Sequence, residues 1–370
     1  MRVLILGGGV IGASVAYHLA AEGADVVVIE RSAVACAASG KSGGFLALDW
    51  CDGTPLMALA RRSFALHAEL AEELGGAWGY RRMTTYGGTV SRFPARMPRG
   101  AGPGWLSPDV AINGRLGSAE TTAQVQPAAF TTGMMDAAEE RGAELRLGQA
   151  TGLLRRNGDV VGVQLEGDTL EGDVVVIAMG PWSVLAAGWL AMPPVYGLKG
   201  HSLVFETGPT LPPEALFLEY AEAAGSMLSP EVFPRADGTT YVCGISTASP
   251  LPADPDLVAP DDGATDRLRA LCTRMSPVLA RSRILASQAC YRPVTGDGLP
   301  LIGAVPGARG AYVATGHGVW GILNAPETGE AMTELILNGA ASTVDLSPFD
   351  PARLAPLEPG RATVIHTLRG

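Results

Sequence analysis

Lysine is nearly absent from this chain of 370 residues. Only Lys41 and Lys199 are lysines, and arginine supplies the other basic side chains. Positive charge is scarce overall, with 27 Lys and Arg against 37 Asp and Glu and a formal net charge of -10. A broad phosphate-binding surface needs the opposite balance, so we expect no nucleic-acid partner.

Cysteine is also sparse, and its five positions follow no pattern. They are scattered and form no C-x-x-C pair, so the sequence indicates neither a disulfide framework nor a zinc site, at Cys36, Cys51, Cys243, Cys272 and Cys290. No apolar run reaches the ~18 residues of a membrane helix. An apolar strand is expected directly after Met1, which leaves no room for a signal peptide. We expect a cytoplasmic protein without a transmembrane segment.

The composition that remains is that of a folded protein, with 47% hydrophobic and 17% charged residues. A chain of this length exceeds the size at which one core usually stops growing, so we expect two closely joined lobes. The first thirty residues predict a β-α-β unit. Residues 3–6 are an apolar run, residues 10–22 have helical character that Gly23 ends, and residues 25–30 suit a parallel strand buried on both faces.

The turn inside this unit carries the pattern G-x-G-x-x-G, formed by Gly7, Gly9 and Gly12, and Glu30 ends the second strand about 20 residues later. Gly7 permits the turn, Gly9 lets the backbone approach a pyrophosphate, and Gly12 lets the helix pack close to the strand. The helix N-terminus attracts the anion, and Glu30 accepts hydrogen bonds from a ribose. These features predict a dinucleotide site, against the alternative of a glycine-rich turn without a ligand.

Later segments alternate between helical and strand patterns. Helices are expected over 56–74, 127–142 and 266–275, and strands over 86–93, 144–147, 160–165, 174–178 and 310–315. Asn157-Gly158 predicts a hairpin between strands 144–147 and 160–165. A second, antiparallel sheet is expected over 195–206, 231–234 and 239–244, and loops over 94–104 and 249–263. Asn324 and Pro326 are expected to start a last helix that Gly339 ends.

Three further segments let a backbone approach a ligand, which suits a long, extended cofactor. They are residues 39–44 (Ser-Gly-Lys-Ser-Gly-Gly), residues 174–182 (Val-Val-Val-Ile-Ala-Met-Gly-Pro-Trp) and residues 316–321 (Gly-His-Gly-Val-Trp-Gly).

With these motifs and the block at residues 292–303 (Arg-Pro-Val-Thr-Gly-Asp-Gly-Leu-Pro-Leu-Ile-Gly), the sequence resembles the D-amino-acid oxidase, glycine oxidase and sarcosine oxidase superfamily of FAD enzymes. The motifs cover nearly the whole chain in family order. The resemblance implies an α/β fold, in which a Rossmann-like FAD-binding domain carries an inserted α+β substrate domain built on an antiparallel sheet. The implied FAD-binding domain comprises residues 1–80, 126–192 and 296–345, the substrate domain 81–125 and 193–295, and a C-terminal extension 346–370.

The resemblance also implies FAD as the cofactor and a set of residues around it. The expected cofactor-binding residues are Gly7, Gly9, Val10, Ile11, Gly12, Glu30, Arg31, Ser39, Gly40, Lys41, Ser42, Gly43, Gly44, Ala150, Ala178, Gly180, Trp182, Arg292, Gly316, Gly318, Val319, Trp320, Gly321 and Ile322. The implied reaction passes a hydride from the carbon beside an amine to flavin N5, after which the imine hydrolyses.

Three residues are expected to take part in the chemistry. Arg292 matches the family arginine that pairs with a substrate carboxylate, and the alternative is an interdomain salt bridge. His317 precedes the last helix, whose N-terminus would face the flavin pyrimidine edge, and packing alone is the alternative role. Glu231 departs from the family pattern, which has a tyrosine there. It either attracts a second cationic group or N-substituted amine of the substrate, or it pairs internally with an arginine.

Other positions leave alternatives open. Cys290 matches a cysteine that the sarcosine oxidase branch bonds covalently to the flavin, but the preferred interpretation is a small buried residue beside a strand. Lys41 and Lys199 lie near expected site segments, where a compact ammonium or chance explains them.

Three functions fit the sequence. The first is an oxidase of a small amine or amino acid that uses oxygen. The second is a dehydrogenase that passes electrons to a quinone or carrier protein. The third is a flavoprotein retained for binding or assembly.

Overall fold

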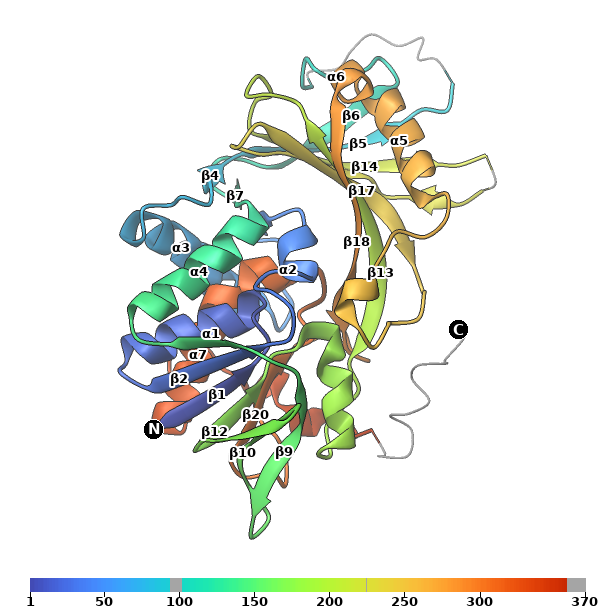
Figure 1. The fold of residues 1–370 in the computed structure, drawn as a ribbon. Coiled ribbons are helices and arrows are strands. Elements are labelled where there is room, and N and C mark those ends of the chain that lie inside the picture. The colour runs from blue at the N-terminus through green and yellow to red at the C-terminus, as the bar shows by residue number, and fades with distance from the viewer. Residues whose placement is uncertain (94–101, 224, 358–370) are drawn as a thin grey trace.

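Two large sheets dominate the computed structural model, which describes residues 1–93, 102–223 and 225–357 (Figure 1). The first sheet has six strands in the order β19-β20-β12-β1-β2-β8. Neighbouring strands are parallel except β19 and β20. The bounds are β1 (Arg2–Leu6), β2 (Asp25–Glu30), β8 (Glu144–Leu147), β12 (Val174–Ile177), β19 (Leu301–Ala304) and β20 (Ala311–Thr315).

Both faces of this sheet are buried, which explains why its strands are continuous apolar runs. On one face Val3 and Ile5 pack against four helices, and on the other Leu4 and Leu6 pack toward a small three-stranded sheet. The helices are α1 (Val10–Ala21), α3 (Met57–Glu73), α4 (Pro127–Glu140) and α7 (Gly321–Asn338), and the small sheet consists of β9 (Ala150–Arg156), β10 (Asp159–Leu165) and β11 (Asp168–Glu171).

The second sheet has the order β18-β13-β17-β16-β14-β5-β6, with β15 beside β14. β14 and β5 are parallel, and the other neighbouring strands that the structure describes are antiparallel. The bounds are β5 (Thr84–Val90), β6 (Val110–Gly117), β13 (Tyr196–Glu206), β14 (Glu214–Ala221), β15 (Met227–Leu228), β16 (Glu231–Pro234), β17 (Thr239–Thr247) and β18 (Arg283–Val294).

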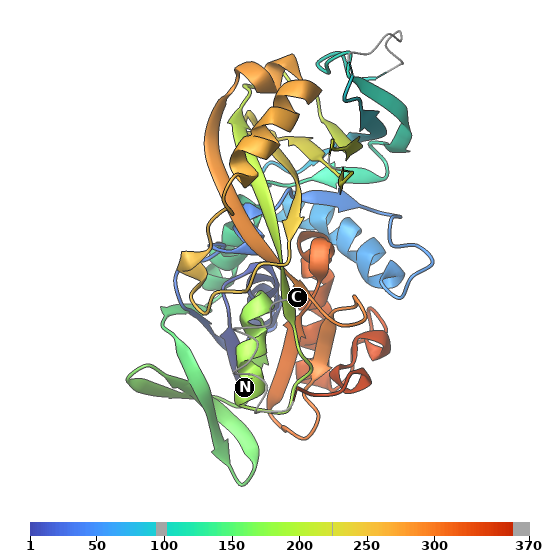
Figure 2. The ribbon, with the colours of Figure 1, turned by 90° about the vertical axis from the view of Figure 1, so that its right-hand side faces the viewer.

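Helices α5 (Ala264–Met275) and α6 (Pro277–Arg281) cover the end of the second sheet that is remote from the first (Figure 1). Two long strands connect the halves of the molecule, because β13 and β18 run from the second sheet down to the first (Figure 2). The predicted α/β fold, with a Rossmann-like sheet and a second, mostly antiparallel sheet, is therefore confirmed.

Two predicted elements need correction. Asn157 and Gly158 do turn a hairpin, but its first strand is β9, because β8 pairs with β2 in the main sheet. The last helix starts at Gly321 rather than at Asn324, and Pro326 lies inside it. Proline lacks the N–H that an interior turn needs, so the sequence pattern favoured a later start.

The domain boundaries stay a prediction. Strands β4 (Arg81–Arg82) and β7 (Thr122–Gln124), from the range expected for the substrate domain, pair with β3 (Phe45–Ala47) in a small sheet of their own. Residues 94–101 of the expected loop 94–104, and residues 358–370 of the expected C-terminal extension, lie outside the described residues.

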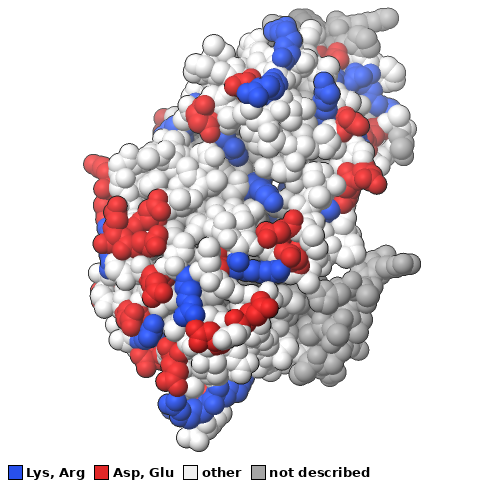
Figure 3. Space-filling model, in the orientation of Figure 1, with Lys and Arg blue, Asp and Glu red and all other residues white. Residues whose placement is uncertain are grey.

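The face of the molecule in Figure 3 carries basic and acidic side chains intermixed. Among the described residues, no helix has the length and apolar character required to cross a membrane.

Candidate active site

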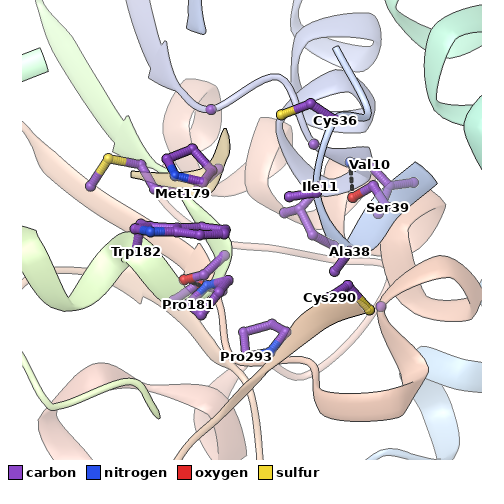
Figure 4. Close-up of a pocket in the computed structure, with 18 of the residues that line it drawn as sticks. Val10, Ile11, Cys36, Ala38, Ser39, Met179, Pro181, Trp182, Cys290 and Pro293 are labelled. Atoms are coloured by element: carbon purple, nitrogen blue, oxygen red, sulfur yellow. Dashed lines mark hydrogen bonds between the residues drawn. The ribbon is translucent and has the colours of Figure 1, made fainter. Parts of the chain in front are cut away.

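A cavity lies where the carboxyl ends of β1, β2 and β12 meet the second sheet, and segments from most of the chain form its wall (Figure 4). This edge is where parallel α/β sheets bind ligands. In Figure 4, Val10, Ile11, Ala38 and Ser39 lie on the right and Met179, Pro181 and Trp182 on the left, with Cys290 and Pro293 below them.

Most of the predicted site residues lie in this wall. They are Gly7, Gly9, Val10, Ile11, Glu30, Arg31, Ser39, Ser42, Gly43, Ala150, Ala178, Gly180, Trp182, Glu231, Arg292, His317, Gly318, Val319, Gly321 and Ile322. The four motif segments of the sequence thus converge on one space.

Six predicted residues do not form part of the wall: Gly12, Gly40, Lys41, Gly44, Gly316 and Trp320. The glycines among them serve close packing. A Cβ on Gly40 would lie 2.1 Å from Ala35 O, and one on Gly44 would lie 2.0 Å from Val125 O. Lys199, the other lysine, also lies away from the cavity and pairs with Asp261.

The turn after β1 has the geometry that a dinucleotide motif requires. Gly7 has φ +111°, and a Cβ there would lie 2.5 Å from Ala178 O. A Cβ on Gly12 would lie 2.0 Å from Gly7 O. Only glycine at this position therefore allows α1 to pack so closely against the turn. Ser39 Oγ accepts a hydrogen bond from Val10 N at 2.9 Å and places the 39–43 segment beside the start of α1.

Glu30 is held at the end of β2 by two backbone groups. Its Oε2 accepts from Gly8 N at 2.7 Å and its Oε1 from Ser32 N at 2.9 Å. A carboxylate has about four lone-pair sites, and Oε1 also accepts from the Cys36 thiol with Sγ 4.0 Å away, so Oε2 keeps one site for a further donor. Glu30 lines the cavity and can therefore accept from a hydroxyl-bearing ligand there.

The segment of residues 249–263, here called the strap, connects the two halves across the cavity. From the first half, Arg31 Nη2 lies 2.8 Å from Asp254 Oδ2, and Trp182 Nε1 donates to Pro252 O at 2.8 Å. From the second half, Lys199 donates to Asp261. Ala253 and Pro255 of the strap line the cavity.

Asp261 of the strap is held in its ionised form. Partial burial of its carboxylate raises the pKa, but hydrogen bonds to the carboxylate outweigh this effect. Lys199, Thr247 and Ser249 donate to this carboxylate and lower its pKa to about 2. The His201 ring faces Asp261 as well and accepts from its backbone N–H at 3.1 Å. The strap is thus fixed to β13 and β17 by a network centred on one charge.

The second sheet presents two opposite charges to the cavity. Arg292 on β18 extends over Gly200 of β13, where an added Cβ would lie 3.3 Å from Nη2, and its Nη1 donates to Ser246 Oγ at 3.0 Å. Glu231 on β16 accepts from the Cys243 thiol, with Sγ and Oε2 3.4 Å apart. Among the described residues no arginine forms an ion pair with Glu231 within 4.0 Å, so the internal pair, one of the two alternatives for this residue, is not found.

His317 lines the cavity, is 4% exposed, and has one buried ring nitrogen without a hydrogen-bond partner among the described residues. Thr328 Oγ1 donates to Asn324 O at 2.7 Å and so accepts from His317 Nε2 at 3.1 Å. The Nδ1 atom is then an acceptor, and it has no hydrogen bond within the described structure. Burial lowers the pKa of His317 to about 3, so the ring is neutral at physiological pH.

The cavity contains residues that sequence analysis did not select as site residues. Tyr241 and Cys243 lie two apart on β17 and so face the same side, and Cys36 lies near Glu30. The two-residue period of β17 next to Glu231 was the signal that could have identified the first two. The position of the strap depends on the distant Lys199, and no local pattern predicts it.

The cavity fits an FAD by these internal criteria. The glycine turn at the start of α1 accepts a pyrophosphate, Glu30 has a free lone-pair site, and the buried Nδ1 of His317 lacks a donor that a bound ligand can supply. Cys290 lines the same wall, and burial raises the pKa of its thiol.

Comparisons with known proteins agree with this geometry. An oxidoreductase of Schizosaccharomyces pombe, named without a substrate, is 29% identical over 95% of this chain and 97% of its own length. A glycine oxidase of Pseudomonas putida is 27% identical over 95% of this chain and 98% of its own. The crystal structure of glycine oxidase from Geobacillus kaustophilus has a TM-score of 0.78 at 24% identity, covering 95% of this chain and 99% of that one, and shows the same fold.

A family model described as FAD dependent oxidoreductase (DAO) matches residues 2–335, which include the glycine turn, the cavity wall on the second sheet and nearly all of α7. This chain is therefore a member of the DAO family of FAD-dependent oxidoreductases.

Proposed function

We propose that this protein binds FAD in the cavity and oxidises the C–N bond of a small amine or amino acid. The observation that carries the proposal is the position of Arg292, whose guanidinium faces the cavity that the dinucleotide turn also lines. A guanidinium offers parallel N–H donors to a carboxylate, and its charge persists at any physiological pH.

The proposed binding residues divide by segment. The turn at Gly7 and Gly9 and the start of α1 hold the pyrophosphate, and Glu30 holds a ribose. Ser39, Ser42, Gly43 and the 178–182 and 317–322 segments surround the remainder of the cofactor. When bound, FAD supplies at N5 the acceptor for a hydride from the carbon beside the nitrogen.

The protein's own contribution to the reaction is to bind and orient the substrate. Arg292 binds the substrate carboxylate, and Ser246 fixes one end of the guanidinium. Between the two halves, Phe45 of β3 packs against Phe217 and Phe233 of the second sheet, with ring centroids 4.9 to 5.5 Å apart. Released imine hydrolyses in solution.

Anaerobic bleaching of the flavin tests the proposal. Purified protein with FAD is mixed with D-amino acids, glycine, N-methyl amino acids and basic amines, and absorbance is followed without oxygen. We expect at least one of these amines to bleach the flavin in the wild type, and Arg292→Leu to lose the response to carboxylate-bearing substrates. A flavin that none of them reduces would contradict the proposal and favour a binding or assembly role.

The electron acceptor is decided by a second measurement. We propose oxygen, as for an oxidase, and expect peroxide in proportion to substrate consumed under air. Fast anaerobic bleaching followed by slow reoxidation in air, with rapid reoxidation by a quinone, identifies a dehydrogenase instead.

A further inference from the structure

The cavity wall on the second sheet carries a carboxylate that no other function of the site explains. Glu231 lies at the first residue of β16, and its Oε2 is hydrogen-bonded to the Cys243 thiol. Its other oxygen, Oε1, has no hydrogen-bond partner among the residues that the structure describes, and Glu231 keeps partial exposure because it faces the cavity.

Arg292 is near enough to act on Glu231 but does not neutralise it. The two residues lie on β16 and β18, with β17 and β13 between them, so their backbones are separated by three strand spacings of about 4.8 Å each. The guanidinium extends over Gly200 and is hydrogen-bonded to Ser246 rather than to Glu231. The wall thus presents a positive and a negative group that form no ion pair with each other, which matches a ligand that carries a carboxylate and an ammonium.

We propose that Glu231 binds the ammonium of the substrate and accepts its proton before oxidation. In this step one N–H bond of the ammonium breaks and an O–H bond forms on Glu231. The products are a neutral amine and a neutral carboxylic acid, so charge and atoms balance. The lone pair released on nitrogen is then free to form the C=N bond as the substrate is oxidised. This inference rests on the proposed function.

The surroundings of Glu231 make it a stronger base than a free carboxylate. Burial raises its pKa, against the opposing effects of Arg292 and the Cys243 thiol. A base whose pKa lies nearer the working pH is a better catalyst, because it is both ionised and able to hold a proton.

Among the described residues, burial shifts the pKa values of the other neutral titratable groups that face this part of the cavity away from neutrality. Burial raises the pKa of the Cys243 and Tyr241 side chains well above their usual values, raises that of Cys290, and lowers that of His317 to about 3. Arg292 stays charged, and Lys41 acts on Cys290 from the first half of the molecule. A pH dependence of substrate oxidation that lies well below the pKa of the free amine is therefore assigned to Glu231.

The test is the rate of anaerobic flavin reduction as a function of pH, with the substrate found in the bleaching screen. In the wild type we expect the rate to rise with pH and reach a plateau well below the pKa of the free amine. In Glu231→Gln we expect the rate at pH 7 to fall by about 10²- to 10⁴-fold. The deficit should shrink as the pH approaches the pKa of the amine, because only substrate that is already neutral reacts. Glu231→Asp should restore part of the rate.

Two controls separate this role from a structural one. Glu219→Gln changes an exposed glutamate on the neighbouring strand β14 and should leave the profile unchanged. Acetate, which has no ammonium, should perturb the flavin spectrum of Glu231→Gln at least as strongly as that of the wild type, since Arg292 remains and a negative charge is gone.

The outcomes are distinct. A wild-type flavin that no amine bleaches overturns the proposed function and this inference together. Bleaching with the same pH profile in wild type and Glu231→Gln overturns the proton-accepting role alone. If Glu231→Gln does not retain FAD, the pH profile of the wild type alone tests the role. A wild-type rate of flavin reduction that follows the pKa of the free amine overturns it. A variant that merely loses preference for diamines would show that Glu231 binds a second cationic group instead.

Discussion

His67 Nε2 lies 2.9 Å from the carbonyl oxygen of Ile322, the helical acceptor that Pro326 leaves without an N–H donor. A histidine on α3 thus completes a turn of α7 that its own sequence interrupts. Burial lowers the pKa of His67 to about 4, so the ring is neutral and carries its proton on the nitrogen that faces the carbonyl.

The first prediction concerns this contact. His67→Leu leaves a buried carbonyl without a donor and should lower the free energy of unfolding by about 1–3 kcal/mol. Pro326→Ala restores a helical N–H, so the same histidine substitution should cost less in that background. Urea unfolding of the four proteins in a double-mutant cycle measures the difference. Equal costs in both backgrounds would show that the contact does not compensate for the proline.

A second prediction follows from Glu327, which is fully buried on α7 with Arg62 Nε 3.8 Å from its Oε2. Burial and the neighbouring Glu330 carboxylate raise the pKa of Glu327 to about 8. The folded state then binds a proton that the unfolded state releases above about pH 4.5, so stability falls as pH rises from there to about 8.

Glu327→Gln removes the titrating carboxylate, so the free energy of unfolding should no longer fall with rising pH. In the wild type this fall amounts to at most about 1.4 kcal/mol per pH unit. Unfolding by urea at pH 5 and pH 8 should give similar stability for variant and wild type at the lower pH, and a more stable variant at the higher. Glu72→Gln, on an exposed face of α3, serves as the control and should behave as the wild type. A wild type with no loss of stability over this range would refute the prediction.

The third prediction tests whether the strap retains the cofactor. Asp261→Asn weakens the network with Lys199 and should raise the dissociation constant for FAD about fivefold, because the strap lines the cavity. Asp262→Asn, on the next and exposed residue, is the matched control. Fluorescence of released flavin measures both, and equal release from the two variants would exclude the effect.

His317 allows a pair of variants that separate its two nitrogens. Asparagine keeps an acceptor near Nδ1, whereas glutamine keeps a donor near Nε2 for Thr328. We expect His317→Gln to weaken FAD binding by about 1–3 kcal/mol, since a donor of the cofactor is left without a partner. His317→Asn should bind more tightly than His317→Gln in a flavin titration, and the reverse order would exclude Nδ1 as the acceptor.

The last prediction settles the open role of Cys290. The thiolate is the nucleophilic form of cysteine, and burial keeps the pKa of this thiol raised. We therefore expect FAD to be bound without a covalent bond, so that acid precipitation gives a colourless pellet and a yellow supernatant. A yellow pellet from the wild type that turns colourless in Cys290→Ser would demonstrate the covalent bond.

Local signals in the sequence were sufficient for the N-terminal unit. The bounds of β2 match the prediction because an apolar run buried on both faces depends only on its own residues. The predicted start of α7 was wrong because His67, which supplies the hydrogen bond that makes Pro326 acceptable inside the helix, lies on α3. It is more than 250 residues away in the chain. β9 was missed because its polar positions, such as Arg155 and Arg156, face out of a small surface sheet and interrupt the apolar pattern.

The candidate site shows the same division. Sequence motifs predict the glycine turn, Glu30 and Arg292 as site residues, whereas Tyr241, Cys243 and the strap reach the cavity through strand pairing and distant ion pairs. Motif glycines such as Gly40 and Gly44 were assigned to a ligand although they permit close backbone packing. Spacing alone does not distinguish these two uses of glycine.

The cavity wall joins Leu6 near one end of the chain to Ile322 near the other. A growing polypeptide therefore has no complete binding site until the segment around Ile322 has been synthesised. Once inside, the ligand ties the first and last segments together noncovalently, and its binding energy adds to the resistance of the whole chain to unfolding.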